Sequence, residues 1–161
     1  MVKIGESTKL IGEYSGKLVA GHRVALPVAL RKLLGNSFVM TKGYEGCLLI
    51  VPSSSWESLI QPMESRSFLD RNVRDSLRFL VGSAFEITAD AQGRVVIPET
   101  LRAYAQTLYS ERSSCEVVFV GLVNWIEVWE KSRWLERNTF LEENADAIAQ
   151  ELISVKESQS V

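Results

Sequence analysis

The stretch Arg23-Val-Ala-Leu-Pro27-Val-Ala-Leu-Arg31 returns 71 residues later as Arg94-Val-Val-Ile-Pro98-Glu-Thr-Leu-Arg102. A second repeated segment follows at an offset of 78 residues, where segment 43–56 corresponds to segment 121–134. The seven extra residues fall in the polar stretch 109–115, where an insertion is well tolerated. A chain that repeats one small unit predicts two similar halves that share or abut their cores.

The composition is that of a soluble globular protein, because 46% of the 161 residues are hydrophobic and 24% are charged. No apolar run approaches the roughly 18 to 20 residues needed to cross a bilayer. The segment Met1–Glu6 lacks the apolar core of a signal peptide. We therefore expect a cytoplasmic protein without membrane contact.

Residues that commonly carry catalysis or bind metals are scarce. His22 is the only histidine, and Cys47 and Cys115 lie 68 residues apart in apolar surroundings. A zinc site or a histidine-dependent nucleophile is hard to assemble from this set, and buried thiols are the simpler role for the cysteines. We expect no catalytic residue, no metal and no cofactor, so that an enzyme such as a nuclease is disfavoured.

The net charge of −2 hides an asymmetry between the two halves. Residues 1–80 carry 11 Lys and Arg against 7 Asp and Glu, whereas residues 81–161 carry 7 against 13. A protein that binds nucleic acid would place its binding face on the basic first half, since phosphate contacts supply most of the non-specific affinity. Two surfaces of opposite sign that help subunits to dock remain an equal alternative.

Turn signals and apolar alternation divide the chain into short elements. Two strands are expected around the first turn, where residues 10–14 and 17–19 enter the turn and residues 23–26 leave it. The further expected strands are 38–40, 47–51, 85–88, 94–97, 117–120 and 125–129. Pro27 and Pro98 each open a short helix, and Gly35 suits the end of the first one. Ser53 or Ser54 can cap a further helix that begins near Trp56.

Two longer helices are also expected. The apolar spacing in 68–81 predicts an amphipathic helix that joins the copies, and Ser132 precedes a long helix from Arg133 to about Val155. We divide the chain into a first repeat, a connecting helix, a second repeat and a C-terminal helix with a frayed tail, at residues 9–63, 64–82, 83–134 and 135–161.

The sharpest local signal is Asp90-Ala91-Gln92-Gly93-Arg94 between two alternating strands. An aspartate at the start of a turn accepts hydrogen bonds from backbone N–H groups two and three residues on. Gly93 can adopt the left-handed conformation that closes a bulged hairpin, and Arg94 lies within reach of Asp90. A well-formed hairpin with an ion pair would explain this segment without any binding function.

An arginine followed by apolar residues and a proline occurs twice, at Arg23 to Pro27 and at Arg94 to Pro98. With Asp90 four residues before Arg94, this pattern resembles the motif of the bacterial MraZ family of transcriptional regulators. The resemblance covers about residues 10 to 140 and includes the segments 12–14, 41–48 and 126–129 and Trp134. It implies an α+β fold of two tandem AbrB/MraZ-type swapped-hairpin β-barrel halves, with short helices between hairpins and a C-terminal helix.

The resemblance also implies a function. Members of the family assemble into rings, bind short direct repeats upstream of the division and cell-wall gene cluster, and regulate its transcription. The implied partners are double-stranded promoter DNA and other copies of the chain, without a small-molecule substrate. The implied location is the cytoplasm, in association with the nucleoid.

The first motif departs from the family pattern. Val19 stands where the family has aspartate, and Gly21-His22 replaces the usual Lys-Gly before Arg23. The turn can still form, because Gly21 can take the positive φ of a type II turn and His22 tolerates unusual backbone angles. Arg23 loses a carboxylate partner, which leaves its donors available to DNA but leaves the loop less ordered.

The candidate DNA-binding residues are Arg23, Lys17, His22 and Arg94, and the residues expected to shape the loops are Asp90, Gly93 and Gly21. For Arg94 an ion-pair role is an open alternative, since acidic residues surround it. The alternative function is an oligomeric scaffold that uses the duplicated barrel for protein contacts and has weakened DNA recognition.

Overall fold

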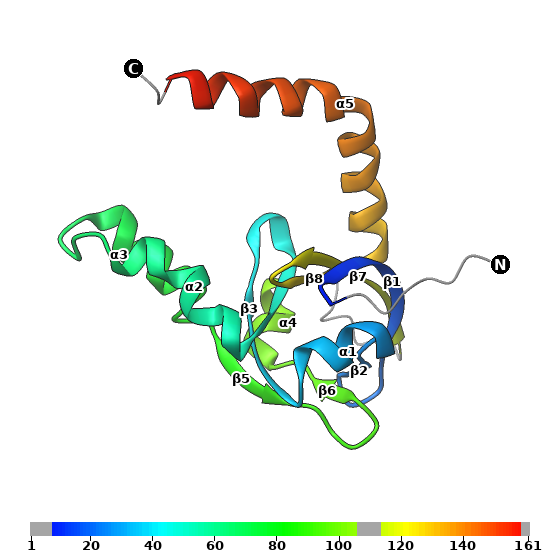
Figure 1. Cartoon of the computed structure of the whole chain (residues 1–161). Coiled ribbons are helices and arrows are strands. Elements are labelled where there is room, and N and C mark those ends of the chain that lie inside the picture. The colour runs from blue at the N-terminus through cyan, green and yellow to red at the C-terminus, as the bar shows by residue number, and fades with distance from the viewer. Residues whose placement is uncertain (1–7, 106–113, 159–161) are drawn as a thin grey trace. The chain divides into compact units, whose positions relative to one another are not determined.

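The computed structural model describes residues 8–105 and 114–158. The chain divides into two compact units, Met1–Glu130 and Lys131–Val161. The first unit contains one eight-stranded antiparallel sheet in the order β5-β3-β4-β8-β7-β1-β2-β6 (Figure 1). The strands are β1 (Leu10–Val19), β2 (Arg23–Ala25), β3 (Ser37–Lys42), β4 (Leu48–Pro52), β5 (Phe85–Thr88), β6 (Arg94–Val96), β7 (Ser114–Val123) and β8 (Ile126–Glu130).

Helices occupy the connections between strands. They are α1 (Val28–Leu34), the 3₁₀ turn η1 (Tyr44–Gly46), α2 (Ser53–Glu64), α3 (Arg71–Leu80) and α4 (Glu99–Tyr104). The second unit contains α5 (Lys131–Ser158). None of the helices within the described residues is long and apolar enough to cross a membrane.

The sheet curls into a nearly closed barrel. Its two edge strands, β5 and β6, are consecutive in sequence and are joined by residues 89–93 alone, so the edges must lie near each other (Figure 1). The Asp90 N–H donates to the Arg94 carbonyl across this gap at 2.9 Å. Curling of this kind removes most of the exposed sheet edge that would otherwise pair with other chains.

The two sequence copies exchange strands to build the barrel. β1 of the first copy pairs along its whole length with β7 of the second copy, and β5 of the second copy pairs with β3 of the first. β2 pairs with β6, and β4 pairs with β8, each a contact between equivalent strands. The expected fold class is therefore confirmed as α+β with two interleaved swapped-hairpin copies.

The barrel interior is filled by apolar side chains from both copies. Phe38, Met40 and Phe119 are fully buried at 0% exposure, and they belong to the same cluster as residues of α1 and α4. Those helix residues are Leu30, Leu34 and Leu101. The one core therefore depends on both copies, and neither copy has a separate interior.

The expected strands on either side of the first turn are confirmed. Residues 10–14 and 17–19, which enter the turn, belong to the one strand β1, and β2 leaves the turn and pairs with β1. One expectation about strands was wrong. The Asp90 segment does not join a simple hairpin, since β5 pairs with β3 and β6 pairs with β2. This difference arises from pairing between the copies, which is not visible in local sequence patterns.

Three expectations about helix starts were also wrong. α2 begins at Ser53, whose hydroxyl donates to the Ser37 carbonyl at 3.2 Å instead of capping its own helix. α5 begins at Lys131, so Ser132 lies inside the helix. α3 begins after Asp70, whose carboxylate accepts from the Asn72 N–H at 2.8 Å, and the expected helical residues 68 and 69 lie outside it.

Candidate nucleic-acid interface

The two arginines of the repeated motif lie on one short ladder. The paired residues are Arg23 with Val96, Val24 with Val95, and Ala25 with Arg94. Val24 and Val95 are buried, and side chains alternate between the two faces of a strand. Arg23 and Arg94 therefore both lie on the outer face of the ladder, at its opposite ends.

Each loop is anchored by a backbone bond to the other copy. The His22 carbonyl accepts from the Ile97 N–H at 3.0 Å, and the Gly93 carbonyl accepts from the Leu26 N–H at 2.9 Å. These two bonds are equivalent under the repeat, so the ladder holds both loops on the same side of the barrel. The fold thus places the two motif loops as a pair.

The second loop is ordered by Asp90. Its Oδ1 accepts from the backbone N–H groups of Gln92 and Arg94, both at 2.9 Å, and its Oδ2 accepts from Arg94 Nε at 2.8 Å. The second backbone bond goes to the residue four positions on, one position farther than the turn pattern predicts. The bonds from the Arg94 backbone and then its side chain hold the pKa of Asp90 below its ordinary value of 3.8.

Gly93 adopts a φ of 76°, a conformation that favours glycine. The side chain of Arg31, from α1 of the other copy, lies directly over it, and a Cβ added at Gly93 would lie 2.5 Å from Arg31 Cδ. Arg31 belongs to the repeated stretch of sequence, but the sequence indicated no role for its side chain. The repeat gave no signal for it, since only the strand exchange brings α1 to the second loop.

The first loop is built differently. Gly21 and His22 have φ values of 78° and 59°, so two consecutive residues are left-handed, whereas the expected type II turn requires only one. Val19 takes the place that Asp90 has in the second loop and pairs with Arg23 in the β1–β2 ladder. Arg23 is exposed, and its side chain forms no hydrogen bond or ion pair with any residue in 8–105 or 114–158.

Lys17 and His22 are both exposed near the same end of the barrel. Lys17 lies on β1 directly opposite Glu116 of β7, so a carboxylate accompanies this cation. His22 lies at the turn itself, immediately before Arg23. Among the three Lys and Arg candidates, Arg23 is the one that has valines, and no carboxylate, as its paired residues on the neighbouring strands.

Arg23 and Arg94 line one shallow hollow of about 420 Å³. The other lining residues are Glu86, Ile87, Thr88, Ala89, Asp90, Val95 and Val96. The hollow therefore presents one arginine without a carboxylate partner beside one that is ion-paired. A polyanion approaching this face would contact Arg23 with less desolvation of existing ion pairs than Arg94.

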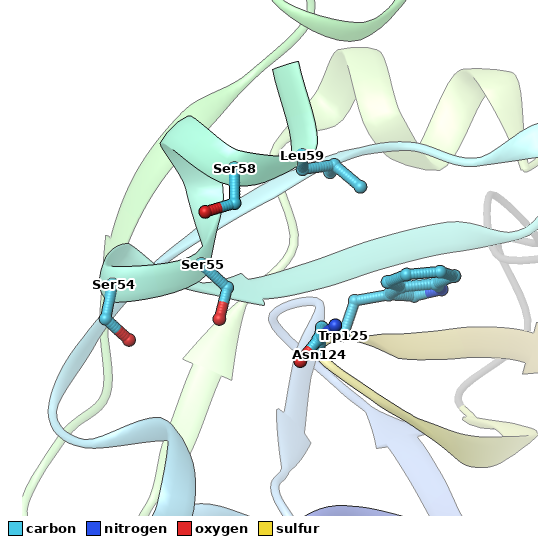
Figure 2. A pocket seen from close by; sticks show the side chains of 6 residues that line it. All are labelled: Ser54, Ser55, Ser58, Leu59, Asn124 and Trp125. Atoms are coloured by element: carbon cyan, nitrogen blue, oxygen red, sulfur yellow. The ribbon is translucent and has the colours of Figure 1, made fainter. Parts of the chain in front are cut away.

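A second hollow of about 240 Å³ differs in chemistry. Figure 2 shows side chains from α2 and from the β7–β8 turn around it. Its lining consists of Ser54, Ser55, Ser58, Leu59, Asn124 and Trp125. No charged side chain is among these lining residues, so this hollow lacks the cations that phosphate binding requires.

Potential metal ligands are dispersed across the part of the chain that the structure describes. Within residues 8–105 and 114–158, no group of three or more His, Cys, Asp or Glu side chains could hold a metal ion.

Comparison with known proteins identifies the repeat. A family model described as "MraZ protein, putative antitoxin-like" matches twice, over residues 10–79 and 80–155. The chain belongs to the MraZ family. The two matches coincide with the MraZ copies that exchange strands in the barrel.

Several proteins that carry the family's name are similar to this chain over most of their length. "Transcriptional regulator MraZ" of Pediococcus pentosaceus is 35% identical over 143 residues, which is 89% of this chain and 96% of the relative. The protein of the same name from Pelotomaculum thermopropionicum is 34% identical over 145 residues, or 90% and 96%. That of Clostridium acetobutylicum is 34% identical over 128 residues, or 80% and 86%. These MraZ relatives are transcriptional regulators by name.

Proposed function

We propose that this chain is a sequence-specific DNA-binding transcriptional regulator that contacts duplex DNA with the outer face of β2 and β6. The observation that supports it is the exposed Arg23 side chain, which points outward and has no partner among the described residues. A guanidinium with all donors available can bind phosphate, or guanine O6 and N7 in the major groove. The names of the relatives favour the same function.

The two loops would make unequal contributions. Arg94 is already bound to Asp90, so transferring it to a phosphate would leave the Asp90 carboxylate without its partner. Its role is to keep the second loop in shape while Arg23 makes the stronger contact. Lys17 adds positive charge near Arg23, and both Lys17 and His22 add hydrogen-bond donors there.

A single chain with a net charge of −2 and few basic contacts would hold DNA weakly. Several copies acting together gain affinity through effective concentration, by about 10² to 10⁴ in favourable geometry. Head-to-tail contacts that close into a ring present identical loops in the same orientation, which matches short direct repeats. We therefore include a homo-oligomeric ring in the proposal, with repeats spaced by roughly one helical turn of about 10 bp.

The regulated genes follow from the family resemblance. We propose that the direct repeats lie upstream of the division and cell-wall gene cluster, and that the protein acts in the cytoplasm in association with the nucleoid. This part of the proposal depends on the resemblance, whereas the choice of face depends on the geometry of Arg23.

The alternative function is a protein-interaction scaffold on the same fold. It is favoured by the exposed Phe68 and Leu69, at 73% and 74%, where Arg74 Nη1 donates to both of their carbonyls at 2.8 and 2.7 Å. Two adjacent exposed large apolar side chains can serve as a protein contact. The carboxylates of Glu86 and Glu116 near the proposed DNA face also favour it.

Selection of bound sequences from random duplexes by the purified protein tests the proposal. We expect enrichment of a short motif in direct repeat, and an affinity that falls steeply as salt rises. Enrichment of no sequence, together with binding that is absent at moderate salt, would instead support the scaffold. The mass of the free protein in solution, measured in the same preparation, reports the ring separately.

A further inference from the structure

Arg23 lies in the middle of a row of three side chains on the outer face of the barrel. Val19 of β1 is its partner on one side, and Val96 of β6 is its partner on the other. Paired residues on neighbouring strands project to the same face. Both valines are exposed, at 45% and 51%, so the row presents methyl groups on either side of a guanidinium.

The second copy has no such row. There the position of Val19 is held by Asp90, which binds Arg94, and the residue opposite Arg94 on β2 is Ala25. The difference between the copies is therefore chemical as well as electrostatic. One arginine is flanked by a carboxylate and the other by branched apolar side chains.

Branched apolar side chains beside an arginine on a DNA-binding face have a natural partner. In the major groove, thymine presents a 5-methyl group, and guanine presents the two acceptors that suit arginine. Neighbouring strands lie about 4.8 Å apart, so the row from Val19 to Val96 spans about 10 Å. Base pairs rise by about 3.4 Å, so the row covers about three base-pair steps.

We propose that Val19 and Val96 are specificity-determining residues that contact the methyl groups of thymines beside the guanine bound by Arg23. The inference rests on the proposed function, since it requires this face to enter the major groove. It also gives a positive role to the valine that the first loop has at the place of Asp90 in the second. The first loop lacks the ion pair that Asp90 forms in the second loop, and in its place Val19 contacts a thymine methyl group.

Replacing thymine by deoxyuridine tests this directly, because the change removes the methyl group and leaves every base-pair hydrogen bond in place. The probe is the duplex selected by the wild-type protein, with single thymines replaced in turn. Loss of one buried methyl contact predicts about fourfold weaker binding. We expect that loss at one or more thymines within three base pairs of the Arg23-dependent guanine, and no loss at thymines farther away.

The matching protein variants are Val19→Ala and Val96→Ala, with Val28→Ala as control, since Val28 is 62% exposed on α1 outside the row. Each row variant should bind the thymine duplex about fourfold more weakly and lose its sensitivity to one deoxyuridine. Val28→Ala should keep the wild-type ratio. Wild-type protein that binds all deoxyuridine duplexes as well as the parent would overturn the inference alone, whereas absence of any sequence-selective binding would overturn the proposed function with it.

Discussion

Arg23 and Arg94 occupy equivalent places in the two sequence copies and opposite ends of one three-residue ladder, but only Arg94 is ion-paired. Arg94 Nε lies 2.8 Å from Asp90 Oδ2, whereas Val19 stands in the corresponding place beside Arg23. A duplication that keeps both arginines on one face has thus produced two different environments. The exposed arginine is the centre of the proposed DNA contact, and the paired one maintains the neighbouring loop.

Asp90→Asn should weaken the second loop and lower the Tm, because a neutral amide accepts less strongly from Arg94 and the backbone N–H groups. The wild-type pKa of Asp90 is depressed, so its stabilisation is present above the ordinary value of 3.8 and is lost as pH falls through the lower, folded-state value. Thermal unfolding between pH 2 and 6 checks this. The difference in Tm between wild type and variant should shrink toward the acid end, and a constant difference would contradict the assignment.

Gly16→Ala should destabilise the barrel by about 1 to 3 kcal/mol. A Cβ at Gly16 would lie 2.6 Å from Cε2 of the fully buried Phe119, so the ring would have to move within a packed core. The neighbouring exposed Ser15→Ala is the control, with an expected change within about 0.5 kcal/mol. Equal midpoints for both variants in urea unfolding would show that the core at this position is less tightly packed than the structure indicates.

Thr41→Val should loosen the attachment of α3 to the sheet. The buried Thr41 hydroxyl donates to the Leu80 carbonyl at 2.5 Å, and valine keeps the shape but removes the donor. Leaving a buried acceptor unsatisfied costs about 1 to 3 kcal/mol. Hydrogen exchange should accelerate in residues 71–80, whereas Thr139→Val, which removes an exposed hydroxyl bond to the Leu135 carbonyl, should leave that exchange unchanged.

Gly93→Ala should lower stability for two reasons that can be separated. The φ of 76° is strained for alanine, and the added methyl group would press on the Arg31 side chain. In an Arg31→Ala background the second cost disappears, so the double variant should lose less than the sum of the two single variants. Strict additivity in unfolding experiments would mean that Arg31 does not cover the loop in solution.

Short-range chemistry allowed much of the fold to be predicted. The prolines at 27 and 98 precede helices, and Gly35 ends the first helix with a φ of 75°. Asp90 accepts hydrogen bonds from its own turn because the donors lie within four residues. These features depend on neighbours in sequence, and the residue types alone indicate them.

Features that depend on distant residues were missed. The residue types around β1 do not show that Gly16 packs against the Phe119 ring, because β7, about a hundred residues away, brings that ring to it. Arg31 covers Gly93 for the same reason. The outer row of Val19, Arg23 and Val96 joins three strands from both copies, so no local pattern could have revealed it.

The central claim is that the outer face around Arg23 contacts DNA, and the salt dependence of binding by Arg23→Ala tests it most directly. Exposed Arg66, which follows the C-cap of α2 and is not among the residues that line the hollow of Arg23, provides the control variant Arg66→Ala. We predict that Arg23→Ala binds the selected duplex at least about tenfold more weakly, while its assembled mass and the affinity of Arg66→Ala stay at wild-type values. If Arg23 contacts phosphate, the slope of log K against log salt should also fall by about 0.9. An Arg23→Ala protein with unchanged affinity and unchanged slope would contradict the account.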